Sequence, residues 1–283
     1  MRFWSTYNRY KEKEYFIDNF LLNNNIIKYD EIIEEINVDT NHTLDGREQR
    51  AVAEGTIEYQ QDIYKIVGNI EYGINIEYEE NLINETEEWK VILEDIEFDN
   101  YKKEISLLFD FKGDMDDAYT VFDYNTFKVK IETLSLSEDA PYWGKLLIQA
   151  INVLEKRQFD LAFLLIFTAF ENFITLLVED HKRYFYKEIN IEKMELKNKM
   201  KVLLKHILNI PPGSEEHPSI SIIEQLFSDL YKIRNNIAHG QYRKVDYNDC
   251  QKCFDLFIIY RTIIKYKPKN NHDLLSVLKK ECL

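Results

Sequence analysis

Residues 135–141 read SLSEDAP, and the spacing of apolar residues along the chain changes at this stretch. Before it, Ile, Val, Tyr and Phe alternate with charged residues, as in DIYKIVGNIEYGINIEYEE (62–80), KKEISLLFDFKG (102–113) and TFKVKIETLSL (126–136). Alternation with a period of two is typical of half-buried antiparallel strands. After it, apolar residues recur at helical spacing. The stretch therefore predicts a domain boundary, with one domain over 1–138 and another over 139–283.

The second domain is predicted to be all-helical, and Pro141 suits the first turn of its first helix. Ser221 and Glu224 form a capping-box pattern that predicts the start of a later helix, and Asp246 opens the next one. Residues 14–36 predict a short helix and an early strand ahead of the alternating segment. The expected fold class is α+β, with an antiparallel β-sandwich or barrel followed by a helical bundle. Its helices are expected at 142–157, 159–186, 190–208, 222–238 and 247–266.

The charge of the chain is divided unevenly between the two halves. The 283 residues carry a formal net charge of -14, but residues 1–135 have 14 Lys and Arg against 31 Asp and Glu, whereas residues 136–283 have 22 against 19. The first half is therefore strongly acidic, as a solubilising surface or as a surface for a particular partner. The second half, at +3, can approach a polyanion such as nucleic acid.

Other sequence features bear on compartment, membrane and cofactors. Three cysteines without a secretory signal favour a reducing cytoplasm, and the Cys250–Cys253 pair has neither a second pair nor a suitably spaced His, so no metal site is expected. Residues 161–178 are apolar and just long enough to span a bilayer. Because Glu171 and Asn172 lie near their middle, this segment is expected to be a central bundle helix or an oligomer interface, and no membrane partner is expected. No phosphate-binding loop or dinucleotide motif is present, so no cofactor is expected.

The stretch RNNIAHG, residues 234–240, ends one of the predicted helices with unusually polar residues. At about 100° per residue, His239 falls about 140° from Arg234 around a continuing helix. The two side chains can converge only if the helix ends or distorts near Ala238, or if two copies of the helix meet. Gly240 is placed where a left-handed helix terminus would lie. The alternative is a polar helix stop, in which a protonated His239 is favoured by the helix dipole.

This string, in an all-helical half that also contains the apolar helix bearing Glu171, resembles the HEPN family (higher eukaryotes and prokaryotes nucleotide-binding). Arg234, Asn235 and His239 match the family pattern of Arg, a polar residue and a His four to six positions on. The form is most similar to the Apea-like and abortive-infection branch, and the resemblance covers roughly residues 140–270. It implies a ribonuclease that needs no metal and acts as a homodimer, with Arg and His of both protomers lining one cleft.

The resemblance also suggests roles for individual residues. An Arg can hold a phosphate through two hydrogen bonds and an imidazole can move a proton near neutral pH. Arg234 would thus stabilise the transition state, and His239 would help to activate the ribose 2′-OH, leaving a 2′,3′-cyclic phosphate. Asn235 and Asn236 would support the site or contact RNA, with helix capping as the alternative for Asn235.

Two further residues have open assignments. Glu171 would pair with Arg234, or would be a satisfied polar group inside the bundle. Some family members carry a modifiable Tyr two residues after the His, whereas Tyr242 stands three after His239. This departure weakens any expectation of control through modification of Tyr242.

The sequence thus predicts a cytoplasmic, RNA-cleaving effector of a bacterial antiviral (abortive-infection) or toxin system. RNA is its expected substrate, and the acidic first domain is expected to act as a sensor or regulator that responds to a protein or phage-derived trigger. This biological setting comes from the family resemblance. The alternative is a non-catalytic, dimerising module that recognises a protein, a peptide or a nucleotide.

Overall fold

The computed structural model divides the chain into two compact units. It describes residues 2–13, 15–45, 48–74, 89–114, 126–182, 194–211, 217–241 and 244–283. The β unit comprises Ile27–Glu138, and the helical unit comprises Met1–Ile26 together with Asp139–Leu283. The antiparallel strands and the helical second half confirm the predicted α+β class.

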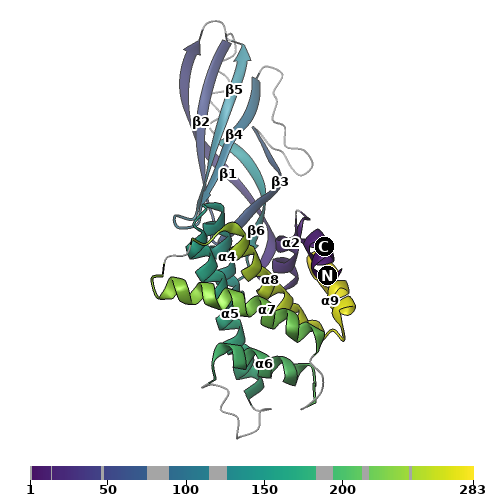
Figure 1. Ribbon diagram of the computed structural model, residues 1–283. Helices are drawn as coiled ribbons and strands as arrows, with labels where there is room; N and C mark the ends of the chain where they lie inside the picture. Colours follow the sequence, from purple (N-terminus) through teal and green to yellow (C-terminus); the bar gives the residue numbers. More distant parts are fainter. Residues whose placement is uncertain are drawn as a thin grey trace. The chain divides into compact units, whose positions relative to one another are not determined.

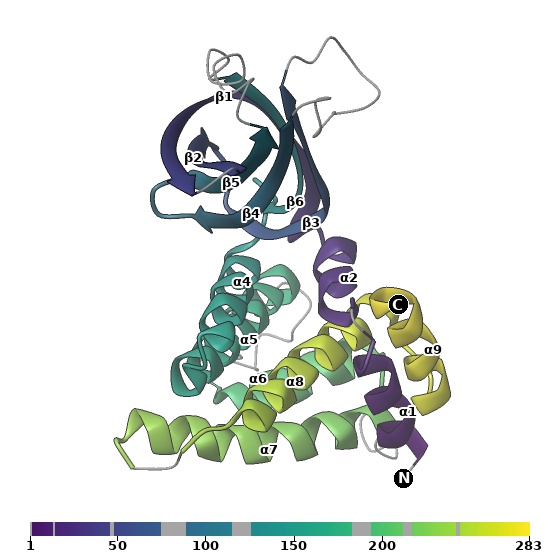
Figure 2. The same cartoon turned by 90° about the horizontal axis from the view of Figure 1, so that it is seen from above.

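The described strands of the β unit form one antiparallel sheet in the order β3-β6-β1-β2-β5-β4. β1 carries the sheet around a bend, because Ile27–Asn37 of this long strand pair with β6 whereas Val38–Asp45 pair with β2. Figure 2 shows the strands curling around a common interior. The strands are β1 (Ile27–Asp45), β2 (Glu48–Glu58), β3 (Ile63–Ile74), β4 (Trp89–Asp99), β5 (Glu104–Asp114) and β6 (Thr126–Leu136).

Alternation along the strands explains this interior. On β5, Ile105, Leu107 and Phe109 are almost fully buried, while Ser106 between them is exposed. These side chains belong to one apolar core with residues of β1, β2, β3 and β6. Successive side chains of a strand point to opposite faces, so a period of two in the sequence gives one apolar face and one polar face.

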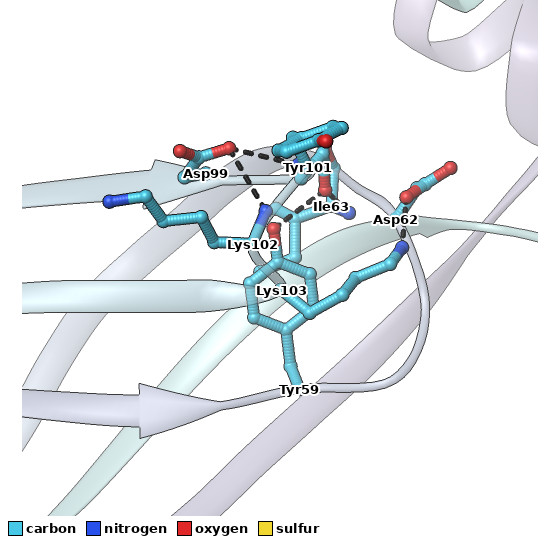
Figure 3. Close-up of polar contacts among 8 residues, drawn as sticks. Tyr59, Asp62, Ile63, Asp99, Tyr101, Lys102 and Lys103 are labelled. Atoms are coloured by element: carbon cyan, nitrogen blue, oxygen red, sulfur yellow. Dashed lines mark hydrogen bonds and ion pairs between the residues drawn. The ribbon is translucent and has the colours of Figure 1, made fainter.

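Two side-chain links join the strands that end the sheet, β3 and β4. The Leu93 backbone N–H donates to the Tyr72 hydroxyl at 3.0 Å. At the other end, the Asn100 side chain accepts a hydrogen bond from the Ile63 N–H at 2.8 Å and donates one to the Ile63 carbonyl at 2.7 Å. Asn100 also accepts from the Tyr59 hydroxyl at 2.7 Å. Figure 3 shows Tyr59 and Ile63 gathered at this turn.

Replacing Asn100 by Ala is expected to destabilise the β unit by about 2 kcal/mol, because it leaves the partly buried Tyr59 hydroxyl and Ile63 backbone groups without these partners. Burial raises the pKa of Tyr59 to about 12, so its phenol stays a donor at neutral pH. Urea unfolding followed by circular dichroism measures the change. Lys102→Ala alters an exposed side chain in the same turn and serves as the control. Equal stability of the two variants would contradict this role for Asn100.

The helical unit is built around α5, with α4, α7 and α8 packed against it (Figure 1). α5 is long and apolar enough to cross a membrane, but 56% of that apolar window is buried inside the unit. Its aromatic residues Phe167, Phe170 and Phe173 contact other aromatic rings of the bundle. α5 is therefore the core helix of this unit. The helices are α1 (Arg2–Lys11), α2 (Phe16–Asn23), α4 (Tyr142–Glu155), α5 (Phe159–His181), α6 (Leu196–Ile207), α7 (Pro218–Ala238), α8 (Tyr247–Tyr266) and α9 (Asn271–Cys282).

The expected first domain over 1–138 was wrong for its first 26 residues, which belong to the helical unit. One reason is a buried carboxylate on α8. Asp255 accepts hydrogen bonds from the Tyr7 hydroxyl at 3.1 Å and from the Lys11 ammonium at 2.9 and 3.1 Å. Both donors come from α1, so a charge buried in the bundle is matched only when α1 is docked.

A second buried carboxylate holds α2 in the same unit. Glu281 of α9 accepts from the Asn24 side chain at 3.0 Å and from Lys265 at 2.6 Å, and it also bonds the Tyr266 hydroxyl. The Asn23 side chain donates to the Glu281 backbone carbonyl at 2.8 Å. The two ends of the chain therefore fold together, although more than 250 residues separate them.

Several predicted helix boundaries differ from those observed. α7 begins at Pro218, one turn before Ser221, because proline is well suited to the first turn of a helix. Glu224 pairs with Lys201 at 2.7 Å. The predicted start of α8 is confirmed, because the Asp246 side chain accepts the backbone N–H of Asp249 at 2.9 Å. α1 and α9 were not predicted.

Candidate functional site

Aromatic packing sets α5 against α7 and so positions the candidate site. The Phe167 ring of α5 lies 6.1 Å from that of Phe227 and 6.4 Å from that of Tyr231, both on α7. Glu171 follows Phe167 by one helical turn, and Arg234 follows Tyr231 by almost one turn. The apolar periodicity of the two helices therefore brings their polar residues to a common place.

Arg234 and Glu171 meet at the surface between α5 and α7. The Arg234 Nη2 atom lies 3.7 Å from the Glu171 Oε1 atom, and 37% and 33% of the two side chains are exposed. The Arg234 Nη1 atom also lies 3.5 Å from the Asn235 Oδ1 atom. The pairing of Glu171 with Arg234 was one of two alternatives left open by the sequence, and it is the one that the structure shows. The contact is long and partly solvated, so the guanidinium keeps donors available for another anion.

The environment of Glu171 disfavours its charge. Burial raises the pKa of the Glu171 carboxyl, and the nearby Arg234 guanidinium opposes this shift without overcoming it. Burial therefore disfavours the ionised form of Glu171, and the Arg234 guanidinium offsets part of this cost.

The end of α7 has the complete hydrogen-bond pattern of a Schellman motif. The Gln241 N–H donates to the Asn236 carbonyl at 2.8 Å, and the Gly240 N–H donates to the Ile237 carbonyl at 3.1 Å. Gly240 has a φ of 64°, in the left-handed region that glycine adopts without strain. The predicted left-handed terminus at Gly240 is thereby confirmed. His239 is the last residue on the helical path before the chain turns away.

Within a single copy of the chain, the side chains of His239 and Arg234 do not come together. The His239 N–H still donates to the Asn235 carbonyl at 3.0 Å, so the helical path continues through His239. The two side chains consequently leave the helix about 140° apart. His239 is exposed, and its imidazole makes no hydrogen bond or ion pair with any residue that the structure describes. Of the other predicted site residues, Asn236 is partly buried, and Tyr242 lies outside the described residues.

The cysteines are buried thiols of the helical core. The Cys250 thiol donates to the Phe159 carbonyl at 3.3 Å, and burial raises the pKa of Cys250 to about 12 and that of Cys253 well above its usual value. Such thiols stay protonated at neutral pH and are poor metal ligands. In the described parts of the chain, no three His, Cys, Asp or Glu side chains gather in a metal-binding arrangement.

A cavity of about 720 Å³ lies beside a different flank of α7, between α1 and α8. It is lined by side chains that include Trp4, Gln225, Asp229 and Asn248. Arg234, Glu171 and His239 are not among its lining residues. The candidate site is therefore a surface on α5 and α7, and this cavity is separate from it.

Two residues near the site were missed by sequence reasoning. Tyr231 precedes Arg234 by three residues, and its ring stacks on that of Phe227 at 5.3 Å while 36% of the residue is exposed. Its helical spacing from Arg234 could have identified it. Asn172 has a buried Oδ1 atom without a hydrogen-bond partner among the described residues, next to Glu171. No sequence pattern signals such an atom.

Comparison of the chain with protein-family models, curated proteins and solved structures found no match. The resemblance to the HEPN family therefore rests on Arg234, Asn235 and His239 and on their helical setting. The geometry above shows where these side chains lie.

Proposed function

We propose that the chain is a cytoplasmic, metal-independent endoribonuclease that acts as a homodimer through its helical unit. The observation that supports this most directly is the partly exposed Arg234 guanidinium, held beside Glu171 at 3.7 Å, with an exposed His239 at the end of the same helix. Phosphodiester cleavage requires an anion-binding group and a proton-transfer group at one phosphate, and a dimer of this helix could supply both.

Each of the two residues has a defined part in the proposed reaction. Arg234 binds the non-bridging phosphate oxygens with two N–H donors and stabilises the negative charge that develops on phosphorus. His239 accepts the proton of the ribose 2′-OH as the 2′ oxygen attacks phosphorus. The bond from phosphorus to the 5′ oxygen breaks, and a protonated imidazole or water supplies the leaving oxygen with a proton. The products are a 2′,3′-cyclic phosphate and a 5′-hydroxyl.

The angular separation of Arg234 and His239 is the physical reason for proposing a dimer. Side chains about 140° apart on one helix do not reach the same phosphate. Two copies of α7 that meet about a twofold axis can place the Arg of one copy beside the His of the other. The resemblance to the HEPN family implies the same arrangement.

The distribution of charge is compatible with RNA at the helical unit. The β unit, residues 27–138, has 10 Lys and Arg against 29 Asp and Glu, a net charge of -19, which leaves 26 against 21, or +5, for the helical unit. A polyanion is therefore favoured by the unit that carries Arg234 and His239 and opposed by the other unit.

The product ends of wild-type cleavage test this chemistry. RNA labelled at one end is incubated with the full chain in EDTA, beside the same RNA with a single 2′-deoxy nucleotide at the cleaved position. Cleavage that leaves a cyclic phosphate and is blocked by the 2′-deoxy substitution is expected, because the attacking hydroxyl is then missing. Cleavage that needs a divalent metal, or that is unaffected by the 2′-deoxy nucleotide, would refute the proposed mechanism.

Glu171→Gln is expected to lower kcat for RNA cleavage about 10-fold to 100-fold. Without the Glu171 carboxylate, the Arg234 guanidinium would move away from the position in which it binds the reacting phosphate. The melting temperature at pH 7 should not fall. The pKa of Glu171 is higher in the folded chain than in the unfolded chain. The stability that Glu171 contributes is therefore fully present at pH values below the ordinary carboxyl pKa, and it is lost as the pH rises through the pKa of the folded state. A neutral Gln avoids this loss.

Steady-state kinetics and thermal unfolding of the same Glu171→Gln preparations separate the two effects. Thr168→Ala, a change at an exposed position almost one turn earlier on α5, is the control for altering this helix. A variant that keeps its kcat but melts at a lower temperature would show that Glu171 has only a structural role.

We propose further that the protein serves in a bacterial antiviral or toxin system, with the acidic β unit restraining the nuclease until a trigger acts on it. Like charges repel over about 8 Å at physiological salt, so a tethered unit of -19 lowers the local concentration of RNA. This setting is taken from the family resemblance.

Replacing Ile27–Glu138 with a flexible Gly/Ser linker is expected to raise RNA cleavage several-fold at low salt, and the gain should shrink as salt is added. The replacement keeps residues 1–26, because they belong to the helical unit. Initial rates at roughly 50 and 500 mM salt, together with growth of cells that express each form, measure the effect. Unchanged activity and unchanged toxicity would rule out a restraining role.

A further inference from the structure

The two strands that end the described sheet, β3 and β4, are linked by side chains and not by a ladder of backbone hydrogen bonds. The links join Tyr72 to Leu93 and Ile63 to Asn100. We call the stretch between them, Ile63–Tyr72 of β3 with Leu93–Asp99 of β4, the seam. At about 3.3 Å per residue, the seam is roughly 20–30 Å long. This is enough for an extended peptide of about six residues.

Along the seam, the residues that the structure describes leave the apolar core incompletely covered. Ile105, Leu107 and Phe109 of the interior strand β5 are at most 2% exposed. Ile63 and Tyr72 of β3 are buried in this core, whereas five other apolar residues of the two end strands pack on it but are only partly buried. They are Ile66 and Ile70 on β3 and Leu93, Ile96 and Phe98 on β4. The seam thus combines a partly exposed apolar row with the outer edge of β4.

The outward side of β4 carries a row of exposed carboxylates. Glu94, Asp95, Glu97 and Asp99 are all exposed and occupy the positions between the inward-facing residues. Asp99 accepts the backbone N–H groups of Tyr101 and Lys102 in the turn to β5. The row presents negative charge to a cationic partner, and the unit as a whole has a net charge of -19.

From these features we infer that the seam binds an extended peptide with alternating apolar and basic residues, which adds to β4 as a further strand. Alternate residues of an edge strand direct their N–H and C=O groups away from the sheet, and an added strand can pair with them. On β4 the Leu93 N–H stays with the Tyr72 hydroxyl, and the added strand would displace the exposed Asp95 carboxylate from the Ile96 N–H. Its apolar side chains would cover the row that includes Ile96 and Phe98, and its Lys or Arg side chains would face Glu97 and its neighbours. The inference does not depend on the ribonuclease activity.

The first test uses the full chain and the fluorescein-labelled peptide KVKIKVK, with binding measured by fluorescence anisotropy. One control is the peptide EVEIEVE. The two others are forms of KVKIKVK in which every second backbone nitrogen is methylated, at the odd-numbered residues in one form and at the even-numbered residues in the other. Methylation keeps every side chain but removes the N–H donors of one edge. Binding at least tenfold weaker for EVEIEVE and for one of the methylated peptides is expected. Absence of binding by KVKIKVK, or equal binding by both methylated peptides, would overturn the inference.

The second test places the site on β4. Glu94→Lys combined with Glu97→Lys is expected to weaken KVKIKVK binding about tenfold. The matched control, Glu34→Lys with Glu58→Lys, makes the same change in charge at exposed positions of β1 and β2 and should weaken it less than threefold. Amide exchange of 94–98 should slow when the peptide is bound. Equal weakening by both double variants would show general attraction of a cation to an acidic surface, and would overturn the proposed seam site.

Discussion

Arg234→Ala and His239→Ala are each expected to lower the rate of RNA cleavage by about 10²-fold to 10⁴-fold. The loss for Arg234 follows from removing the donors that would stabilise charge on the phosphate, and the loss for His239 from removing the group that would accept the 2′-OH proton. Both side chains are at least partly exposed, so neither change should prevent folding. Arg234→Lys should also be impaired, because an ammonium cannot form the two parallel hydrogen bonds of a guanidinium.

Lys232→Ala is the matched control for these variants. Lys232 is an exposed cation on α7 two residues before Arg234, so its removal tests whether charge alone matters. Single-turnover cleavage of labelled RNA, with circular dichroism as the check on folding, makes the comparison. Equal effects of all three alanine changes would indicate only an electrostatic RNA contact.

Mixing the two inactive variants tests whether the site is shared between copies. If a cleft needs the Arg of one protomer and the His of the other, heterodimers of Arg234→Ala with His239→Ala retain one intact pair and should regain part of the activity. Failure to regain activity, in mixtures shown to exchange subunits, would contradict the dimeric site. Wild-type protein that binds RNA or a nucleotide without cleaving it would favour the alternative of a non-catalytic binding module.

Lys11→Met is expected to lower the stability of the helical unit by about 3 kcal/mol at pH 7, or roughly 6–12 °C in melting temperature. The change leaves the Asp255 carboxylate, of which only 6% is exposed, without its cation. Asp255 would retain the Tyr7 hydrogen bond at 3.1 Å, which does not compensate for a buried charge. Lys13→Met changes an exposed lysine two residues away and should have little effect.

The destabilisation by Lys11→Met should be larger at pH 7 than at pH 4. Burial raises the pKa of Asp255, and Lys11 is the main group that opposes the shift. A raised carboxyl pKa gives stability that is present at acid pH and is lost as the pH rises through the folded value. Without Lys11 the pKa rises further, so more stability is lost by pH 7. Thermal unfolding at both pH values measures this, and equal destabilisation at pH 4 and pH 7 would show that the ion pair is not the cause.

Local sequence patterns were sufficient for the features that depend on neighbouring residues. The period of two located strands β3, β5 and β6, because alternation along a strand directly produces a buried face and a solvated face. The helix end at Gly240 and the Asp246 cap of α8 were predicted because each depends on hydrogen bonds within a few residues of the chain. The polar residues of the site were found in the same way, as a local departure from the apolar pattern of a helix.

Contacts between distant residues decided the rest. The sequence left two readings of Glu171 open, and only the packing of Phe167 against α7 placed this carboxylate beside Arg234. The end links of the seam likewise depend on pairs such as Asn100 with Ile63, which no local pattern connects.

By itself, the sequence determined the α+β class, the change from strands to helices near residue 138, and the polar string at the end of α7. Only the tertiary structure decided that residues 1–26 belong with the helices, because Asp255 and Glu281 find their partners on α1 and after α2. Periodicity shows which face of an element is buried. It cannot show which distant element covers that face, because a matching polar partner hundreds of residues away leaves no local repeat in the chain.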